Sequence, residues 1–269
     1  MAMTREQHKS ARGTLTSLLF ILAIMGGTAQ PASAQDLSAL SGMEFYVTPY
    51  LWLPGINAAI KTPLLLRPQL NASVSAVDLL GHLDGIPFMG AFEVRQGPLG
   101  FLGDVLHVPV SANITTRDVF YQGGNAVLNA NMGTGVVVYR LLDQPTQFAD
   151  LGLGFRAWGF SMDSTLNPGI LNGVRVSRGA GWGDPLIGGR YHYDFGNGFG
   201  LTAYGDLGGF GVGAHDDWQV IGTAEYAPNP WLNLRLGYRS LNFNYQAGGS
   251  NLGFNIHMKG PILAATFRF

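Results

Sequence analysis

The sequence predicts an all-β chain that closes into an antiparallel transmembrane β-barrel of ten or twelve strands. Three observations lead to this prediction. The last strand alternates apolar and polar residues and ends in Phe, the first residues form an export signal, and the region between them is a charge-poor series of alternating segments.

The C-terminal segment has an apolar residue at every second position, counted back from the end: Phe269, Phe267, Ala265 and Leu263. Arg268 and Thr266 lie between them, so one face of the strand is apolar and the other is polar. Bacterial outer-membrane proteins present a last strand of this kind, ending in Phe, to the barrel assembly machinery. We therefore expect these four residues to act as an assembly signal and to face lipid.

The N-terminus has the features of a cleavable secretory signal. A basic stretch precedes the apolar run Leu15–Met25, which is too short to span a bilayer as a helix. Ala32-Ser33-Ala34 then forms an A-x-A cleavage site, so we expect residues 1–34 to be removed after Ala34 and Gln35 to begin the mature chain. Residues 35–269 are predicted to form a single barrel domain in the outer membrane of a Gram-negative bacterium.

Composition supports a membrane barrel and excludes several other classes. The chain has no Cys, which excludes a disulfide framework, a lipoprotein anchor and thiolate metal sites. Only 12% of its residues are charged, against roughly 25% in soluble domains. After removal of residues 1–34, 13 Lys/Arg and 16 Asp/Glu remain, and this net charge of −3 does not suggest nucleic acid. We predict no cofactor and no metal.

Alternating segments recur along the mature chain and are separated by turn residues. The predicted strands are Gly42–Leu53, Ile86–Gln96, Leu99–Thr115, Ala126–Leu142, Gln147–Ser164, Val174–Asp194, Gly198–Val212, Asp216–Pro228, Trp231–Ala247 and Leu252–Phe269. The region Ile56–Ala76 is either a hairpin in a loop or two further wall strands, which gives ten or twelve strands, with twelve slightly favoured. Ser75 is a candidate N-cap for a short helix at Val77–Leu83.

The connections alternate in length, as they do in outer-membrane barrels. The short ones carry turn residues: Gly97-Pro98, Asp143–Thr146, Gly196–Gly198 and Asn229-Pro230. The longer ones are predicted at Thr116–Asn125, Thr165–Gly181, Gly213–His215 and Gly248–Asn251. We expect the short turns on the periplasmic side and the longer loops outside.

Charged residues of the predicted strands share the face opposite the apolar one. An Arg or Lys that faces lipid at mid-bilayer costs about 2–4 kcal/mol, so these residues are predicted to line the interior. The candidates are Glu93, Arg95, Asp104, Arg140, Arg156, Arg190, His192, Asp194, Asp206, Glu225, Arg235, Arg239 and Arg268. Two interpretations stay open: a salt-bridge network that makes the wall rigid, or a narrow water-filled pore whose basic excess favours anions.

Several stretches together resemble a family of uncharacterised proteobacterial outer-membrane β-barrel proteins. They are TPYLW (Thr48–Trp52), Phe88–Val105, WGDPLIGGR (Trp182–Arg190), GDLGGFGVG (Gly205–Gly213), LGYRSLNFNY (Leu236–Tyr245) and GPILAATFRF (Gly260–Phe269). The resemblance covers the whole mature chain. It implies a porin-like small barrel in the outer membrane and no particular activity.

Other residues carry weaker signals for chemistry. None of the mature histidines, His82, His107, His192, His215 and His257, matches the local signature of a barrel hydrolase, so we expect no catalytic site. His215 with Asp216 and Asp217 is a poor metal site, because adjacent residues of a strand point to opposite faces. Tryptophans near strand ends are interpreted as an interfacial girdle, with a carbohydrate-binding rim as the alternative.

The functional prediction from sequence is a narrow passive pore for small solutes with a charged interior. The alternative is a plugged barrel with a structural or interaction role, and a weaker alternative is an outer-membrane enzyme that modifies lipids. Expected partners are outer-membrane lipids, including lipopolysaccharide, the assembly machinery and small solutes.

Overall fold

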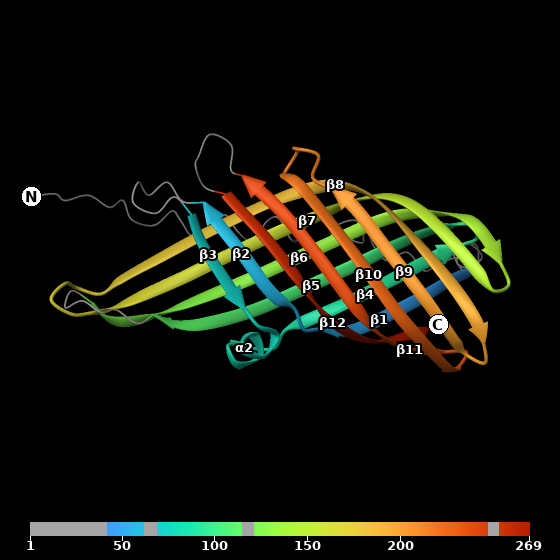
Figure 1. Ribbon diagram of the computed structural model, residues 1–269, viewed down its shortest axis with the longest axis horizontal. Helices are drawn as coiled ribbons and strands as arrows, with labels where there is room; N and C mark the ends of the chain where they lie inside the picture. The colour runs from blue at the N-terminus through green and yellow to red at the C-terminus, as the bar shows by residue number, and fades with distance from the viewer. Residues whose placement is uncertain (1–41, 62–68, 115–120, 247–252) are drawn as a thin grey trace, which may run out of the picture. The chain divides into compact units, whose positions relative to one another are not determined.

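The computed structural model describes residues 42–61, 69–114, 121–246 and 253–269, and these form twelve strands and one short helix (Figure 1). The elements are β1 (Met43–Trp52), β2 (Gly55–Lys61), β3 (Gln69–Val74), α2 (Ala76–Gly81), β4 (Phe88–Gln96), β5 (Leu99–Ile114), β6 (Tyr121–Gln144), β7 (Gln147–Pro168), β8 (Val174–Gly196), β9 (Phe199–Gly208), β10 (Ala214–Asn229), β11 (Leu232–Gln246) and β12 (Gly253–Arg268). The predicted export signal, with Ala34 and Gln35, lies outside the described residues.

The closed antiparallel barrel predicted from the sequence is confirmed. Ten strands, β1 and β4 to β12, form the ring, which closes where β1 pairs with β12. The register places Tyr46 opposite Arg268 and Leu51 opposite Leu263. On its other edge β1 pairs with β4. The residues of the predicted assembly signal thus belong to the strand that completes the ring.

The remaining two strands, β2 and β3, form a hairpin in the same sheet but outside the ring. β2 pairs with the first half of β12, Gly253–Lys259, and β3 ends the sheet. Pro54 separates β1 from β2, and a proline that cannot donate to the ladder is suited to such a break. The closed wall therefore has ten strands, the smaller of the two predicted numbers, and the hairpin outside the ring brings the sheet to twelve.

A short helix follows β3, as expected from the candidate N-cap Ser75. Ser75 caps α2, because its hydroxyl accepts a hydrogen bond from the Asp78 amide at 3.1 Å. The Asp78 carboxylate in turn accepts a hydrogen bond from the backbone N–H of Ser75. Within the described part of the chain, no helix has the length and apolar character needed to cross a membrane.

The short turns lie together at one end of the barrel, called the turn end here. Arg268 donates its backbone N–H to Trp231, and Phe269 donates to Phe45, so the C-terminus lies at the same end as the β10–β11 turn. The left-handed backbone that such tight turns require occurs at Gly97 and Asn197. The four predicted short turns are confirmed. The opposite end is called the loop end.

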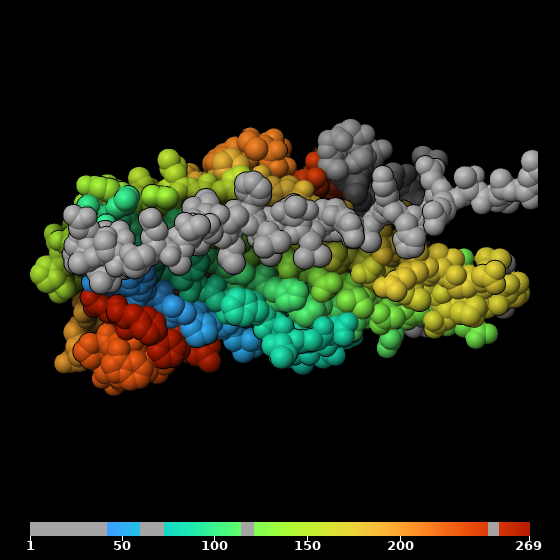
Figure 2. Space-filling view, turned by 180° about the vertical axis from the view of Figure 1, so that it is seen from behind, coloured from blue at the N-terminus to red at the C-terminus, as the bar shows by residue number. Residues whose placement is uncertain are grey.

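Strands β6, β7 and β8 extend far toward the loop end (Figures 1 and 2). β6 and β7 go beyond their predicted bounds of Ala126 and Ser164, and β8 begins at Val174, as its predicted strand did. The predicted loop Thr165–Gly181 is wrong for most of its length, because β7 continues to Pro168 and β8 begins at Val174. Of the predicted loop Thr116–Asn125, residues 121–125 belong to β6, and residues 116–120 lie outside the described residues. The polar residues in these segments do not end the strands. The alternation continues, and the polar residues occupy the outward face.

The outer surface carries an apolar belt near the turn end. Its members are half-exposed or exposed side chains of successive ring strands: Phe45, Val47, Leu51, Phe92, Phe101, Val137, Leu151, Leu153, Phe155, Ile187, Leu201, Leu207, Leu234, Leu236 and Leu263. A 22-residue strand at the usual barrel tilt is about 50 Å tall, roughly twice the height of such a belt. Much of β7 therefore lies beyond the belt.

Beyond the belt, the facing of polar and apolar residues inverts along the same strand. In β7 the outward series changes from Leu151, Leu153 and Phe155 to Ser161, Asp163 and Thr165. The inward series changes from Asp150 and Arg156 to Trp158 and Phe160. The belt half thus has an apolar outside and a charged inside, and the loop-end half has the reverse.

Candidate functional site: the charged interior

A cavity of about 350 Å³ lies inside the belt half of the barrel. Strands from around the ring line it, because every second residue of each strand points inward. Its charged lining residues are Glu93, Arg95, Asp104, Arg140, Arg190, Glu225, Arg235 and Arg239, and all eight were predicted from the sequence to face the interior.

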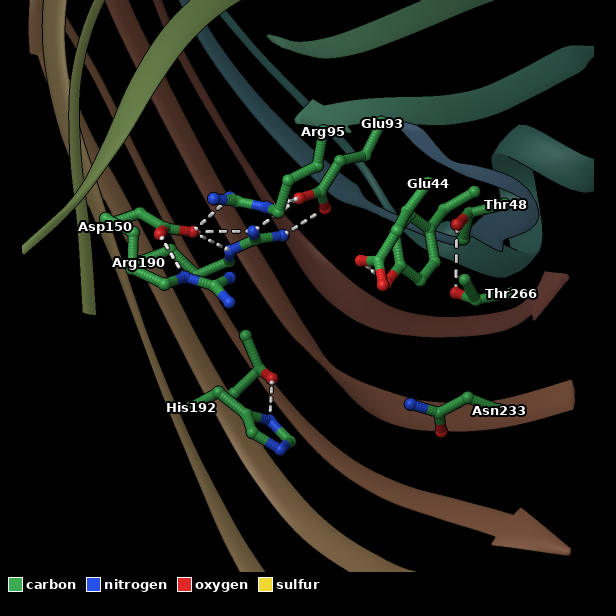
Figure 3. Close-up of polar contacts among 12 residues, drawn as sticks. Glu44, Thr48, Glu93, Arg95, Asp150, Arg190, His192, Asn233 and Thr266 are labelled. Carbon is green, nitrogen blue, oxygen red and sulfur yellow. Dashed lines mark hydrogen bonds and ion pairs between the residues drawn. The ribbon is translucent and has the colours of Figure 1, made fainter. Parts of the chain in front are cut away.

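Asp150 is the centre of one ion-pair network (Figure 3). Its carboxylate accepts hydrogen bonds from Arg95 at 2.9 Å and from Arg140 at 3.0 Å. Arg190 bonds Asp150 at 2.6 Å and reaches Glu93 at 2.7 Å through a second nitrogen. These contacts join β4, β6, β7 and β8 through the interior, and the Asp150 side chain is fully buried.

A second contact crosses the interior between β11 and β5. Arg239 donates to Asp104 at 2.8 Å and to the Tyr50 hydroxyl at 2.9 Å, and Tyr50 itself donates to Asp104 at 2.6 Å. The Arg239 guanidinium also lies 4.7 Å from the centre of the Trp52 ring. Arg239 is only 1% exposed, so this group closes the interior rather than lining open water.

A third group surrounds Arg156 in the middle of the barrel. Arg156 donates to Asp206 at 2.7 Å and to Asp217 at 2.5 Å, and a third donor contact reaches Thr134 at 3.1 Å. Trp158 donates its indole N–H to Asp217 at 3.1 Å. Arg156 is fully buried, and the two carboxylates are almost fully buried. The buried charges are thus paired and hydrogen-bonded, as charges in an interior must be.

Above these charged groups, apolar side chains fill the interior. Trp52, Leu106, Met132, Trp158, Leu241, Phe243 and Ile262 form one buried cluster, with exposures of 0–6%. Trp182 stacks on Tyr245 with ring centres 4.2 Å apart and also packs on Phe243. The girdle interpretation is therefore wrong for Trp52, Trp158 and Trp182, because the inverted facing of the loop-end half places these rings inside. Trp231 is 55% exposed at the β10–β11 turn and fits a girdle.

The side chains around the cavity differ in exposure. The exposed side-chain fraction is 1% for Arg239, 11% for Arg190 and 26% for Arg235, and it is 5% for Arg95 next to the β4–β5 turn. At the rim, Arg268 is 51% exposed and pairs with Glu44 at 2.5 Å. The cavity is therefore accessible at the turn end beside Arg235 and Arg268, and it is closed at Arg239.

His192, Glu225 and Arg235 form the part of the lining with the longest ionic contacts. His192 Nδ1 lies 2.9 Å from the Thr202 hydroxyl and 3.8 Å from Glu225. Glu225 accepts a short bond of 2.6 Å from Asn233, while Arg235 approaches Glu225 only to 3.4 Å. This pair is consequently looser than the network around Asp150.

Two predicted interior residues are not part of these groups. Asp194 accepts the Gly196 amide at 2.6 Å and thereby stabilises the β8–β9 turn. Arg268 belongs to the rim, as described above. The other predicted residues, including Arg156 and Asp206 of the middle layer, are brought together in the interior.

Sequence reasoning missed three buried carboxylates: Asp150, Asp184 and Asp217. The signal for the first two was present, because Asp150 is in phase with Arg156 on β7 and Asp184 is in phase with Arg190 on β8. Asp184 accepts the Ala214 amide at 2.6 Å and the Trp182 indole N–H at 2.9 Å. Asp217 was considered only as a loop residue beside His215.

The other chemical candidates lie apart from the cavity. His215 is exposed, with a 3.4 Å contact to Asp216, and the described residues contain no cluster of His, Asp and Glu arranged to hold a metal ion. Gly205–Gly208 ends β9, and Gly209–Gly213 forms the β9–β10 turn. The sequence did not indicate one further pair, Ser240 and His257 on the outer face. Nε2 of His257 lies 3.0 Å from the Ser240 hydroxyl.

No family model matches the chain, and no curated protein matches it. Among solved structures it is similar to the outer membrane protease OmpT from Escherichia coli, with 10% identity over 84% of this chain and 97% of that one and a TM-score of 0.50. Matches with lower TM-scores include Ail of Yersinia pestis (12% identity, 85% and 99% covered, 0.36) and the toluene transporter TodX of Pseudomonas putida (10%, 87% and 91%, 0.33). At these identities the likeness shows the fold alone, which is that of outer-membrane β-barrels.

Proposed function

We propose that the protein is an integral outer-membrane barrel with an occluded interior and a structural or interaction role. The apolar belt lies in the bilayer, the turn end faces the periplasm, and the long ends of β6 to β8 project outside the cell. Outer-membrane lipids contact the belt, and the assembly machinery recognises the last strand. The protein carries out no chemistry of its own.

One observation carries this proposal: two successive layers of fully buried side chains lie across the interior. The first contains Arg156 and Arg239, which are 0% and 1% exposed, and the second contains Leu241 and Phe243, both 0% exposed. Water-filled pores leave their lining side chains accessible to solvent. Two successive buried layers across the interior therefore support a plugged barrel.

Planar-bilayer recording on the refolded protein tests the proposal. We expect no conductance steps from the natural chain in either dilute or concentrated salt. The double variant Trp158→Ala/Phe243→Ala removes two rings of the apolar layer, and we expect it to give small steps, which also proves that the protein inserts. Leu236→Ala, on the outward face, is the matched control and should stay silent. Regular steps from the natural chain would refute the occluded barrel.

A narrow passive pore is the second candidate, and the 350 Å³ cavity favours it. The cavity provides a charged path through the periplasmic part of the barrel, so conduction needs movement of the Arg156 and Arg239 contacts and of the apolar cluster above them. Conductance steps from the natural chain that disappear when side chains packed around Trp158 and Phe243 are enlarged would support such a gated pore.

A further inference from the structure

Arg235 differs from the other arginines of the cavity in its contacts. Arg95, Arg140 and Arg190 each donate to Asp150 at 2.6–3.0 Å, and Arg239 donates to Asp104 at 2.8 Å. The Arg235 guanidinium comes no nearer to a described carboxylate than 3.4 Å, and its buried Nε makes no hydrogen bond to a described residue. Arg235 therefore has fewer hydrogen bonds and a longer ion-pair contact than the other arginines of this lining.

The carboxylate beside Arg235 is already engaged by other donors. Glu225 accepts 2.6 Å and 3.3 Å bonds from Asn233 and Thr223, so its oxygens do not depend on Arg235. The Arg235 side chain is still 26% exposed, in a cavity that opens toward the turn end. A guanidinium with several free donors is thus accessible to a molecule entering from that side.

The groups near Arg235 are suited to a small polar ligand. Thr202, Tyr204, Asn233 and Thr266 line the same cavity and supply neutral hydrogen-bonding groups, and Ile221 and Ala264 supply apolar surface. Inside the cavity, five guanidinium groups face four carboxylates, those of Glu93, Asp104, Asp150 and Glu225, which leaves one positive charge among these groups. Asp143 contacts Arg140 at 3.4 Å from outside, where its side chain is 75% exposed. The acids of the middle layer are bonded separately by Arg156, Trp158 and Trp182.

We propose that this cavity binds a small organic monoanion whose carboxylate is held by the Arg235 guanidinium. The planar guanidinium matches a carboxylate in bidentate geometry. A single negative charge neutralises the net positive charge of the lining, and a volume of about 350 Å³ accommodates a body the size of a benzene ring. The proposal adds a ligand class to the cavity and rests on the proposed integral barrel, but it holds whether or not the barrel conducts.

Fluorine NMR on the barrel in lipid nanodiscs tests this binding, with 4-fluorobenzoate as the probe. We expect a saturable change in line width for the natural chain, and none for the neutral isostere 4-fluorobenzyl alcohol at the same concentration. Arg235→Gln should weaken benzoate binding at least about tenfold, because a charge-assisted hydrogen bond is lost. Arg235→Lys keeps the charge without the planar fork and should weaken binding less.

Arg175→Gln is the matched control, since Arg175 is an exposed residue of β8 beyond the belt. Its benzoate affinity should equal that of the natural chain, and heat-modifiable migration on a gel reports folding of each variant. Equal binding of benzoate and the alcohol, or equal affinities of the natural chain, Arg235→Lys and Arg235→Gln, would overturn the proposal. An absence of binding in a silent, folded barrel would overturn the ligand site and leave the occluded barrel intact.

Discussion

Arg239 on β11 and Asp104 on β5 are joined by a 2.8 Å ion pair across the barrel interior. The two strands are not neighbours in the sheet, because β12, β1 and β4 lie between them. This contact therefore fixes the distance between opposite walls. It also helps to close the interior above the cavity.

Removal of Asp104 should destabilise the barrel through the charge that it leaves behind. In Asp104→Ala, the guanidinium of Arg239 stays buried without its carboxylate, and loss of one partner of a buried pair costs about 3 kcal/mol or more. Urea unfolding of the refolded barrel in lipid vesicles measures the loss in free energy of unfolding. The double variant Asp104→Leu/Arg239→Met should recover most of it, and a double variant as unstable as Asp104→Ala would contradict this explanation.

Loss of the Asp150 charge should lower the free energy of unfolding more than loss of an exposed acid. Asp150→Asn leaves Arg95 and Arg190 with the single carboxylate of Glu93, and it leaves Arg140 with only the exposed Asp143, so we expect a loss of about 3 kcal/mol in free energy of unfolding. Asp143→Asn is the control: its side chain is 75% exposed and contacts Arg140 at 3.4 Å, so its effect should stay within about 0.5 kcal/mol. Equal effects of the two variants would show that the network is not a unit.

Gly213 should not tolerate a side chain. A Cβ at this position would lie 2.5 Å from the Gly183 carbonyl oxygen and 2.6 Å from the Asp184 carboxylate. We expect Gly213→Ala to displace the β9–β10 turn and to lower the free energy of unfolding by about 1–3 kcal/mol. Gly222→Ala is the control, because a Cβ there meets nothing within 4 Å. Hydrogen exchange of the Ala214 amide, which donates to Asp184, should accelerate only in Gly213→Ala.

The cap of α2 predicts a local response to pH. Hydrogen bonds from Ser75 lower the pKa of Asp78 below its ordinary value of 3.8. Folded α2 therefore favours the charged carboxylate, and its contribution is present above pH 3.8 and is lost as the pH falls through the lowered pKa. In Ser75→Ala the pKa of Asp78, followed by NMR titration, should return toward 3.8. An unchanged pKa would show that the cap does not stabilise the charged form.

The Ser240–His257 pair provides a test of the proposal that the protein is not an enzyme. A serine nucleophile needs a histidine oriented by a third group and donors for the oxyanion. Among the described residues His257 has no acidic partner, and the neighbouring backbone groups of β11 and β12 are paired in the ladder. We expect no labelling of Ser240 by a fluorophosphonate and no hydrolysis of labelled phospholipid. Labelling that Ser240→Ala abolishes, and Ser161→Ala does not, would establish an active serine.

Much of this arrangement was predictable because strand alternation is local. Arg235 and Arg239 point inward while Leu234 and Leu236 point outward, as a period of two requires. The same rule was sufficient to find Asp150, which was missed although it is in phase with Arg156. The predicted loop Thr165–Gly181 failed because polar residues at the loop end occupy the outward face of continuing strands.

By itself, the sequence determined the strands, the short turns, the α2 cap and the inward side of each strand in the belt half. These features depend on neighbours within a few residues. Only the tertiary structure decided that Arg239 meets Asp104, that Asp150 collects three guanidinium groups, and that Trp158 lies inside. Such contacts depend on how the strands are staggered when the ring closes, and period-two alternation contains no information about that stagger.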